Sequence, residues 1–449
     1  MEKQLGQITF TNKQLRVLIF PLVIEQFLGV AVGLADSVMV ASVGEAAVSA
    51  VSLVDSINVL LFFAMNALAT GGAVVCGQFL GRKDMERANE AGRQLLVFVV
   101  LLGTAVMAAL YLAKSIILHG LFGRIDADVM AYANTYFLIV EASIPFMALY
   151  SAGAAIFRVM GNSSVSMKIS VVMNLVNVCG NAILIFGVGM GVEGVAIPTF
   201  AARVLGAAAV IVLLRNPAYI IHISRPFHYR FQGDMVKKIL QVGVPSSIES
   251  SLFQLGKVML LSLVSSFGTA SIAANAIGNS IATVQTLPAA AIGVGMITVV
   301  SQCAGARDFE HARFYIRKLM CWSYVLMLIW NLILFAIQPL LVGLYNVSGE
   351  AAHLAMIILW LHGGLGILMW PAAFTLPQAL KGAGDTSYVM IVAVASMWTF
   401  RILTGFLFAK YLGMGVLGTW YAMFIDWVCR LLLFLVRYRG KKWETKYVK

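Results

Sequence analysis

The chain is a series of apolar stretches, each long enough to cross a lipid bilayer. A spanning helix needs about 20 mostly apolar residues, and twelve stretches meet this requirement. Backbone polar groups in lipid must pair within a helix or a closed barrel, and the short alternating segments of a barrel are absent. We therefore predict twelve helical spans, at 15–40, 48–76, 92–113, 129–156, 165–187, 192–214, 237–266, 272–303, 318–345, 351–379, 388–410 and 415–436.

The composition agrees with a membrane protein and argues against a nucleic-acid-binding protein. Of the 449 residues, 60% are hydrophobic and 12% are charged, whereas a soluble domain carries about 25% charged residues. The net charge of +12 comes from short basic clusters between the apolar stretches. A phosphate-binding surface needs basic residues gathered on one soluble face, and no soluble domain is present to carry one.

The basic residues also predict the orientation of the chain. The N-terminus, the C-terminus and every second loop between them hold 25 of the 32 Lys and Arg residues. The alternate loops hold Lys114, Arg124 and Lys410. Because cytoplasmic loops are enriched in Lys and Arg, we expect a multi-pass protein of the cell membrane with both termini in the cytoplasm.

Four pairs of motifs recur in order at a nearly constant offset of 223–224 positions. One match could be chance, but four in order indicate a duplication in which each copy holds six spans. The matched pairs are GQFLGRKDMERA from Gly77 with SQCAGARDFEHA from Ser301, FRVMGNSSVSM from Phe157 with LKGAGDTSYVM from Leu380, GMGVEG from Gly189 with GMGVLG from Gly413, and Pro21 and Glu25 with Pro245 and Glu249.

An even number of spans gives both copies the same orientation, the parallel-repeat plan of several transporters. We predict an N-terminal lobe over 1–214, a cytoplasmic connector over 215–236, and a C-terminal lobe with a basic tail over 237–449. A pseudo-twofold axis along the membrane normal then relates the two lobes.

Asp36 is the most informative charged residue inside a predicted span. A charge at membrane depth costs about 2.5–3.5 kcal/mol on insertion scales, so it needs an explanation. Asp36 follows Gly33 by one helical turn and is otherwise surrounded by apolar residues. A carboxyl group in apolar surroundings can exchange a proton near neutral pH, which a proton-coupled transporter requires. The alternative is a structural ion pair, for example with Arg203.

Three asparagines lie on one face of the fifth span. Asn174, Asn177 and Asn181 have the spacing i, i+3, i+7 of a single helical face. Carboxamides facing lipid are costly, so we expect this face to point to a cavity or to neighbouring helices. Hydrogen bonding between helices is one interpretation. The other is a site in which Asp36 and these amides hold a proton or Na+.

The second half carries a different set of polar residues. Lys257 and Arg401 are expected to pair with Glu249 or with helix carbonyls, and His362 is expected to pack rather than relay protons. The remaining polar groups inside these spans are Gln254, Asn275 and Asn279.

No sequence motif indicates an enzyme. The chain lacks a G-x-x-x-x-G-K-[ST] phosphate loop and an H-E-x-x-H zinc motif, so ATP-driven pumping and metalloprotease chemistry are not expected. The five cysteines form no C-x-x-C pair, which argues against zinc or a disulfide framework. We expect no cofactor and no bound transition metal.

Several motifs together resemble the multidrug and toxic compound extrusion (MATE) family. They cover nearly the whole chain: PLVIEQF and LADSVMVASVGEAAVSAVS in the first two spans, GQFLGRKDMERA, FRVMGNSS, NLVNVCGNAILIFGVGMGVEGVAIPT, LKGAGDTS and FRILTGF. The resemblance implies an all-α membrane fold of two six-helix lobes around a V-shaped central cavity. It also implies an antiporter that exports cationic or amphiphilic organic compounds in exchange for H+ or Na+ by alternating access.

The resemblance also implies where the coupling ion binds. It places a cation site in the N-terminal lobe on Asp36, Asn177, Asn181 and Thr199, with a possible Na+ at the first three. Tyr136 matches a cavity-lining position. Asn174, Asn275, Asn279 and Glu249 are further candidates for the substrate cavity.

Two departures refine the resemblance. The family often has Asp where this chain has Asn181, which leaves Asp36 as the main titratable residue of the site. The NorM-like branch also uses acidic residues deeper in the seventh and tenth spans, whereas here Glu249 lies one turn earlier and the tenth span has none. The chain is therefore similar to the DinF-like branch.

A flippase for lipid-linked or polysaccharide precursors is the alternative function, and it should line its cavity with basic residues. A membrane-embedded enzyme or a receptor would need a metal site or catalytic pair that the sequence lacks. The expected partners are small organic substrates and the lipid bilayer, with no nucleic acid, and we expect a monomer. The duplication does not repeat the chemistry, because Asp36 corresponds to Leu260 and Asn177 to Arg401.

Overall fold

A computed structural model describes residues 10–121, 126–223 and 229–447, and the regular structure in these ranges is helical throughout. Five wider, π-helical segments extend or interrupt the α-helices, at Ile116–Leu121, Ile183–Gly187, Pro371–Thr375, Met397–Leu403 and Leu407–Tyr411, and a short 3-10 turn covers Lys442–Thr445. The α-helices are α1 Asn12–Val43, α2 Glu45–Gly81, α3 Met85–Ser115, α4 Ala127–Glu141, α5 Ile144–Val159, α6 Ser163–Ala182, α7 Glu193–Leu214, α8 Gly233–Ser265, α9 Thr269–Gly305, α10 Phe309–Gly343, α11 Gly349–Trp370, α12 Leu376–Gly382, α13 Thr386–Ser396, α14 Thr404–Phe406 and α15 Gly415–Arg439.

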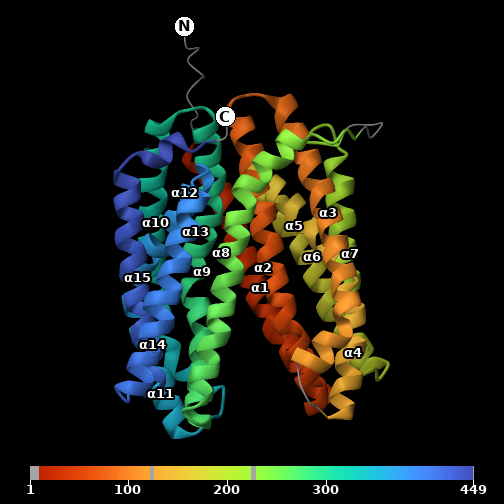
Figure 1. Ribbon diagram of the computed structural model, residues 1–449, viewed down its shortest axis with the longest axis vertical. Helices are drawn as coiled ribbons and strands as arrows, with labels where there is room; N and C mark the ends of the chain where they lie inside the picture. The colour runs from red at the N-terminus through yellow and green to blue at the C-terminus, as the bar shows by residue number, and fades with distance from the viewer. Residues whose placement is uncertain (1–9, 122–125, 224–228, 448–449) are drawn as a thin grey trace. The chain divides into compact units, whose positions relative to one another are not determined.

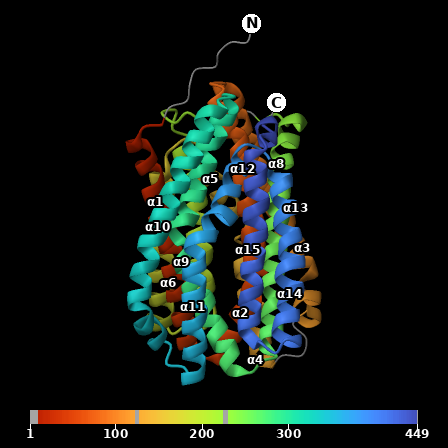
Figure 2. The same ribbon diagram turned by 90° about the vertical axis from the view of Figure 1, so that its left-hand side faces the viewer.

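The helices match the predicted spans. Within the described ranges, 11 continuous helical runs are long and apolar enough to cross a membrane, and the bent pair α4–α5 makes 12 if it crosses as one span. The prediction of an all-helical membrane protein is confirmed. Figures 1 and 2 show the long helices of each unit running lengthwise beside one another.

The fourth span is broken, which the sequence analysis did not predict. Instead of one helix over 129–156, α4 ends at Glu141, α5 begins at Ile144, and the two are bent by 45°. Pro145 lies in the first turn of α5, where its missing N–H is tolerated but where it could not continue α4. The carbonyl of Val140 accepts both the backbone N–H of Ser143 at 3.0 Å and its hydroxyl at 2.5 Å, which closes the turn between the two helices.

The chain forms two compact units. Residues 16–247 form the N-terminal unit, and residues 248–449 together with the chain up to Leu15 form the C-terminal unit. In the N-terminal unit α2 packs against α3, α4 and α5, and α6 packs against α7. In the C-terminal unit α9 packs against α10, α11 and α12 and is mostly buried. The predicted limits of the two lobes stay a prediction.

The repeated motifs have the same local structure in both units. Helices α2 and α9 are each 37 residues long, and each is followed by a turn with a basic residue in the left-handed conformation, Lys83 at φ 60° and Arg307 at φ 58°. Gly161 and Gly384, in the second pair of motifs, have φ 84° and 94°. Glycine adopts such angles without the steric cost that a Cβ adds. The residues that the two copies of each motif share thus lie at the turns that precede the next helix.

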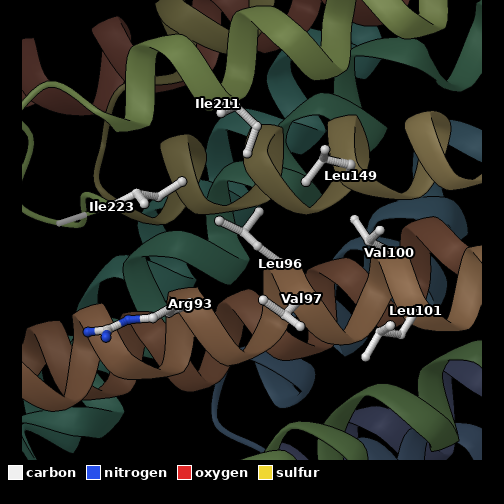
Figure 3. A pocket seen from close by; sticks show the side chains of 8 residues that line it. All are labelled: Arg93, Leu96, Val97, Val100, Leu101, Leu149, Ile211 and Ile223. Carbon is white, nitrogen blue, oxygen red and sulfur yellow. The ribbon is translucent and has the colours of Figure 1, made fainter. Parts of the chain in front are cut away.

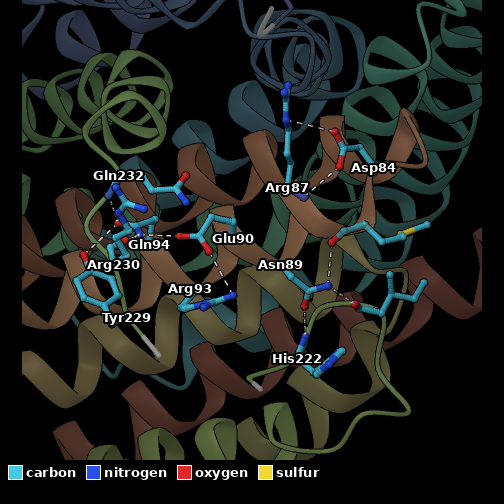
Figure 4. A network of polar contacts seen from close by, with 12 residues as sticks. Asp84, Arg87, Asn89, Glu90, Arg93, Gln94, His222, Tyr229, Arg230 and Gln232 are labelled. Carbon is cyan, nitrogen blue, oxygen red and sulfur yellow. Dashed lines mark hydrogen bonds and ion pairs between the residues drawn. The ribbon is translucent and has the colours of Figure 1, made fainter. Parts of the chain in front are cut away.

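The described ends of the predicted connector lie against α3 (Figure 4). The Asn89 side chain donates to the carbonyl of Ile220 at 3.0 Å and accepts from the backbone N–H of His222 at 2.8 Å. The buried Gln94 amide donates to the carbonyl of Arg230 at 2.6 Å and accepts from the Tyr229 hydroxyl at 3.0 Å. Residues 224–228 lie outside the described ranges, and α8 begins within the predicted connector.

A cavity of about 200 Å³ lies among α3, α5 and α7 (Figure 3). Arg93 is its one charged lining residue, and it pairs with Glu90 at 3.2 Å. The other lining residues are apolar: Leu96, Val97, Val100, Leu101, Leu149, Ile211 and Ile223. Because this cavity offers no carboxylate or amide, it cannot be the predicted cation site.

We predict that Asp84→Ala destabilises the N-terminal unit. The Asp84 carboxylate accepts a hydrogen bond from the backbone N–H of Arg87 at 3.1 Å and caps α3. Losing such a cap costs about 1 kcal/mol, so the melting temperature of the purified protein should fall. Asp126→Ala is the matched control, because Asp126 precedes α4 without a capping side-chain bond. Equal effects of the two substitutions would contradict this assignment.

Candidate functional site

Asp36 lies in the last third of α1 with open space along its helical face. Gly29 and Gly33 precede it by about two turns and one turn and share that face. A Cβ added to either glycine would have no atom within 4 Å. The carboxyl is half-buried. The two glycines therefore keep room for a small ligand beside a carboxyl group that lies within a membrane-spanning helix.

Two amides and a hydroxyl from neighbouring helices of the same unit surround this carboxyl. The Asn181 amide donates to Asp36 Oδ1 at 2.8 Å. In the orientation that satisfies both ends of its amide, Asn177 donates to Asp36 at 2.9 Å (Oδ1) and 3.2 Å (Oδ2) and accepts from Thr199 Oγ1 at 3.0 Å. The structure thus brings together the four residues predicted for the cation site.

The oxygens of this group suit a proton or a small hard cation. Asn181 Oδ1 is buried and has no hydrogen-bond partner among the described residues. Thr199 Oγ1 lies 2.9 Å from the carbonyl oxygen of Val195 as well as 3.0 Å from Asn177. A hydroxyl carries one hydrogen, so Asn177 and Val195 compete for it. Carboxylate, amide and hydroxyl oxygens are the ligands that hard cations prefer.

A second polar group lies in the same unit, around Asp55 of α2. The Tyr136 hydroxyl donates to Asp55 Oδ1 at 3.1 Å, and the Asn58 amide lies 3.5 Å from the same oxygen. Asp55 is close enough to Asp36 for the two carboxylates to repel each other. Tyr136, predicted to line the substrate cavity, is buried in the core of the unit. Its hydroxyl instead positions Asp55.

The break between α4 and α5 places a buried acid beside an arginine. Arg203 donates to the Ser143 hydroxyl at 2.7 Å, and no ion pair joins it to Asp36 among the described residues. Glu141 is fully buried, its two carboxyl oxygens have no hydrogen-bond partner among the described residues, and the charge of Arg203 acts on it. Arg203 is thus held at the helix break by its hydrogen bond to Ser143, two residues after Glu141.

Asn174 does not join the site, although it shares a helical face with Asn177. Its Nδ2 is buried without a hydrogen-bond partner in the described ranges. It lies one turn before Asn177 on α6, and no hydrogen bond joins it to Asp36 among the described residues. Of the three asparagines on the predicted face, Asn177 and Asn181 therefore donate to Asp36, and Asn174 does not.

In the C-terminal unit, the predicted cavity residues Asn275 and Asn279 form hydrogen bonds with neighbouring protein groups. Asn275 Oδ1 accepts from the Trp420 indole at 3.2 Å, and the Asn279 amide donates to the backbone carbonyl of Asn275 at 2.9 Å. His362 is buried between Trp420 and Trp427, and its Nδ1 lies 2.7 Å from Gln285 Oε1.

Of the two kinds of partner predicted for Lys257 and Arg401, Glu249 or helix carbonyls, the first is wrong. Glu249 pairs with Lys381 at 2.8 Å. Arg401 instead has Asp426 of α15 as its nearest acid, at 3.9 Å. Sequence reasoning could not choose among these partners because α8, α12 and α15 are far apart in the chain and meet only in the folded unit.

The comparison with known families decides the identity of the chain. The MatE family model matches residues 21–183 and 245–407, two segments of equal length whose starts lie 224 positions apart. The chain belongs to the MatE family. It is a transporter and not an enzyme, as the sequence motifs predicted, and the family model recognises both copies of the duplication at the offset found in the sequence.

Relatives of this MatE transporter match it over nearly their whole length. It is 25% identical to an uncharacterised transporter, YisQ, of Bacillus subtilis, over 96% of this chain and 94% of the relative. It is 24% identical to a probable multidrug resistance protein, NorM, of Thermotoga maritima, over 97% of this chain and 94% of the relative. The structure of an outward-facing multidrug resistance MATE family transporter has the same fold, with a TM-score of 0.89, 18% identity and coverage of 98% and 100%.

Sequence reasoning missed the group formed by Asp55, Tyr136, Glu141 and Arg203. Of the four, it gave a possible role only to Arg203 and Tyr136, and it placed neither of them beside Asp55 or Glu141. The one signal was Pro145, four residues after Glu141, since proline in a span marks a helix break. Breaks in transporter helices commonly line ion or substrate sites.

We predict that Thr199→Val weakens ion coupling while Thr199→Ser preserves it. Valine has nearly the same shape but removes the hydroxyl that contacts Asn177. A neutral hydrogen bond contributes about 0.5–1.5 kcal/mol, so the apparent affinity for the coupling ion should fall by roughly 2- to 10-fold. The dependence of transport rate on pH and on Na+ concentration measures this. Equal behaviour of the two variants would show that the hydroxyl has no part in ion binding.

Proposed function

We propose that this MatE transporter exports cationic or amphiphilic organic compounds in exchange for H+ or Na+, with Asp36 as the coupling carboxylate. One observation carries the proposal: Asp36, inside a membrane-spanning helix, is bonded to Asn181 and faces the Asn177–Thr199 pair. A proton or Na+ bound here neutralises a charge that is costly at membrane depth. Alternating access couples that event to substrate release.

The names of the relatives support export of drug-like compounds, since the Thermotoga maritima relative is named a probable multidrug resistance protein. Within the family we propose the DinF-like branch. Glu249 is paired with Lys381 at 2.8 Å, so it is not available as a second coupling carboxylate in the C-terminal unit. This leaves ion coupling to the N-terminal unit.

The Asn177 amide provides a way for the protein to respond to the state of Asp36. When Asp36 is ionised, Asn177 donates to it through Nδ2 and accepts from Thr199 through Oδ1. When Asp36 carries a proton or a cation, this donor is no longer required, and the Thr199 hydroxyl can donate to the carbonyl of Val195 instead. Ion binding on α1 thereby changes the hydrogen bonds of α6 and α7.

The ion gradient supplies enough free energy for this exchange. One charge moved through 100 mV provides about 2.3 kcal/mol, and one pH unit adds about 1.4 kcal/mol. Together they sustain a gradient of a neutral solute of several hundred-fold. An electroneutral exchange for a cationic solute uses only the chemical gradient of the ion.

We propose a monomer in the cell membrane with both termini in the cytoplasm. The excess of Lys and Arg on one set of loops supports this orientation. The partners are small organic solutes and the surrounding lipids, with no nucleic acid and no cofactor other than the transported H+ or Na+.

We predict that Asp36→Asn abolishes ion-driven efflux while the protein remains folded. The substitution keeps the shape of the side chain but removes the titratable charge. Dye efflux from everted vesicles, with an imposed pH gradient and with an imposed Na+ gradient, tests this and identifies the ion. Asp128→Asn, which alters an exposed acid in the first turn of α4, should leave efflux unchanged. Ion-driven efflux retained by Asp36→Asn would overturn the proposed function.

A further inference from the structure

The C-terminal unit carries an excess of positive charge inside its spans. Three cations, Lys257, Arg401 and Arg430, are grouped with one acid, Asp426. Glu249 adds nothing to this group because it pairs with Lys381. The group therefore has two more positive than negative charges. Uncompensated charge at membrane depth is costly, so such an excess indicates a negatively charged ligand.

Arg430 and Asp426 form a closed pair that leaves little for a ligand to bind. Arg430 Nε lies 2.8 Å from Asp426 Oδ1, and its Nη2 donates to the carbonyl of Ala393 at 3.0 Å. The Ser396 hydroxyl donates to the same carboxylate oxygen at 2.6 Å. Both charged side chains are almost completely buried, with 4% and 0% of their surface exposed.

Arg401, in contrast, has a buried N–H group that no described residue accepts from. Its Nη1 is 3.9 Å from Asp426 Oδ2, beyond hydrogen-bonding distance, and its buried Nε has no hydrogen-bond partner among the described residues. Guanidinium groups bind oxyanions through such paired N–H groups. Arg401 is thus a charged donor group held in place but not satisfied by its neighbours.

Lys257 adds a second charge beside Arg401. Its side chain is exposed, and no hydrogen bond or ion pair joins it to another described residue. Gly256, the residue before it on α8, packs next to Arg401, since a Cβ added there would lie 2.5 Å from Met397 Cε and 3.3 Å from Ile402 Cδ1. Lys257 lies eight residues before the end of α8, about 12 Å along the helix. Two cations that repel each other are stabilised together by one anion placed between them.

An aromatic surface lies next to these cations. The ring of Phe253, one turn before Lys257 on α8, lies 5.6 Å from the Arg401 guanidinium and 5.3 Å from that of Arg430. Trp398 packs in the same apolar cluster, and its buried indole N–H has no hydrogen-bond partner in the described ranges. This N–H is a donor only, so it too suits an acceptor on a ligand.

This group occupies the position in the second copy that corresponds to the cation site in the first. Arg401 is 224 positions after Asn177, and Leu260 is 224 positions after Asp36. Gly405, which corresponds to Asn181, lies against Leu260, since a Cβ added to it would be 3.2 Å from Leu260 Cδ2. The contact between the helices is retained, but its charge is reversed.

We propose that the C-terminal unit binds an oxyanion group of the transported compound, a carboxylate, sulfonate or phosphate, through Arg401 and Lys257, with Phe253 beside its apolar part. This inference rests on the proposed function and narrows its substrate class to amphiphiles that carry a negative group, zwitterions included. Phospholipid headgroups offer the same oxyanion chemistry, and the test separates them from soluble compounds.

The test compares rhodamine B, which carries a free carboxylate, with its ethyl ester, which does not. Both are presented to the full-length protein in proteoliposomes, as wild type, Arg401→Gln, Lys257→Gln and the control Lys410→Gln, an exposed lysine of the same unit. A charge-assisted hydrogen bond is worth about 1.5–3 kcal/mol, so the KM for rhodamine B should rise roughly 10- to 100-fold in the first two variants. The KM for the ester should stay within about twofold in every variant.

A rise in KM that is equal for the two dyes, or the absence of any rise, overturns the inference. Flipping of a fluorescent phosphatidylglycerol in the same vesicles is the second readout. If the two variants abolish this flipping and leave rhodamine B transport unchanged, the oxyanion belongs to a lipid and the assignment to a soluble compound fails. If the Asp36→Asn variant still shows ion-driven efflux of the ester, the coupling proposal fails, and this result is independent of the anion site.

Discussion

The cost of charge inside a lipid bilayer is the constraint on which the rest of this structure depends. Every ionisable side chain in a span must be paired, neutralised or used. Several acids in the two units are paired with a basic residue, as Glu249 is with Lys381 and Asp426 with Arg430. Asp36 and Arg401 do not. Asp36 is surrounded by amides and a hydroxyl rather than a cation, and Arg401 keeps an unsatisfied Nε.

The two units share a scaffold but not their chemistry. The paired motifs start the same helices through the same left-handed turns, at Lys83 and Arg307 and at Gly161 and Gly384. These positions determine backbone geometry, which both copies need. Other equivalent positions on α1 and α8 are not bound by this requirement and differ, since α1 has Asp36 where α8 has Leu260. A duplicated fold can thus carry different polar residues at equivalent positions of its two copies.

The sequence predicted most of the fold and part of the site, and the reasons differ. Apolar length and the positions of Lys and Arg are local signals, so the twelve spans could be found directly, and the family match confirmed the resemblance. Asp36, Asn177, Asn181 and Thr199 came from that resemblance, and the structure brings them together. The partners of Arg203, Glu249 and Arg401 could not be predicted, because each depends on which of several distant helices packs against it.

The most direct test of the account is whether substrate binding displaces the coupling ion from Asp36. Purified protein in weakly buffered solution can be mixed with a transported dye while released H+ and Na+ are measured with a pH indicator and an Na+ electrode. The account predicts release of one of these ions from the wild-type protein and of neither from Asp36→Asn. Undiminished ion release from Asp36→Asn, with dye binding intact, would contradict it.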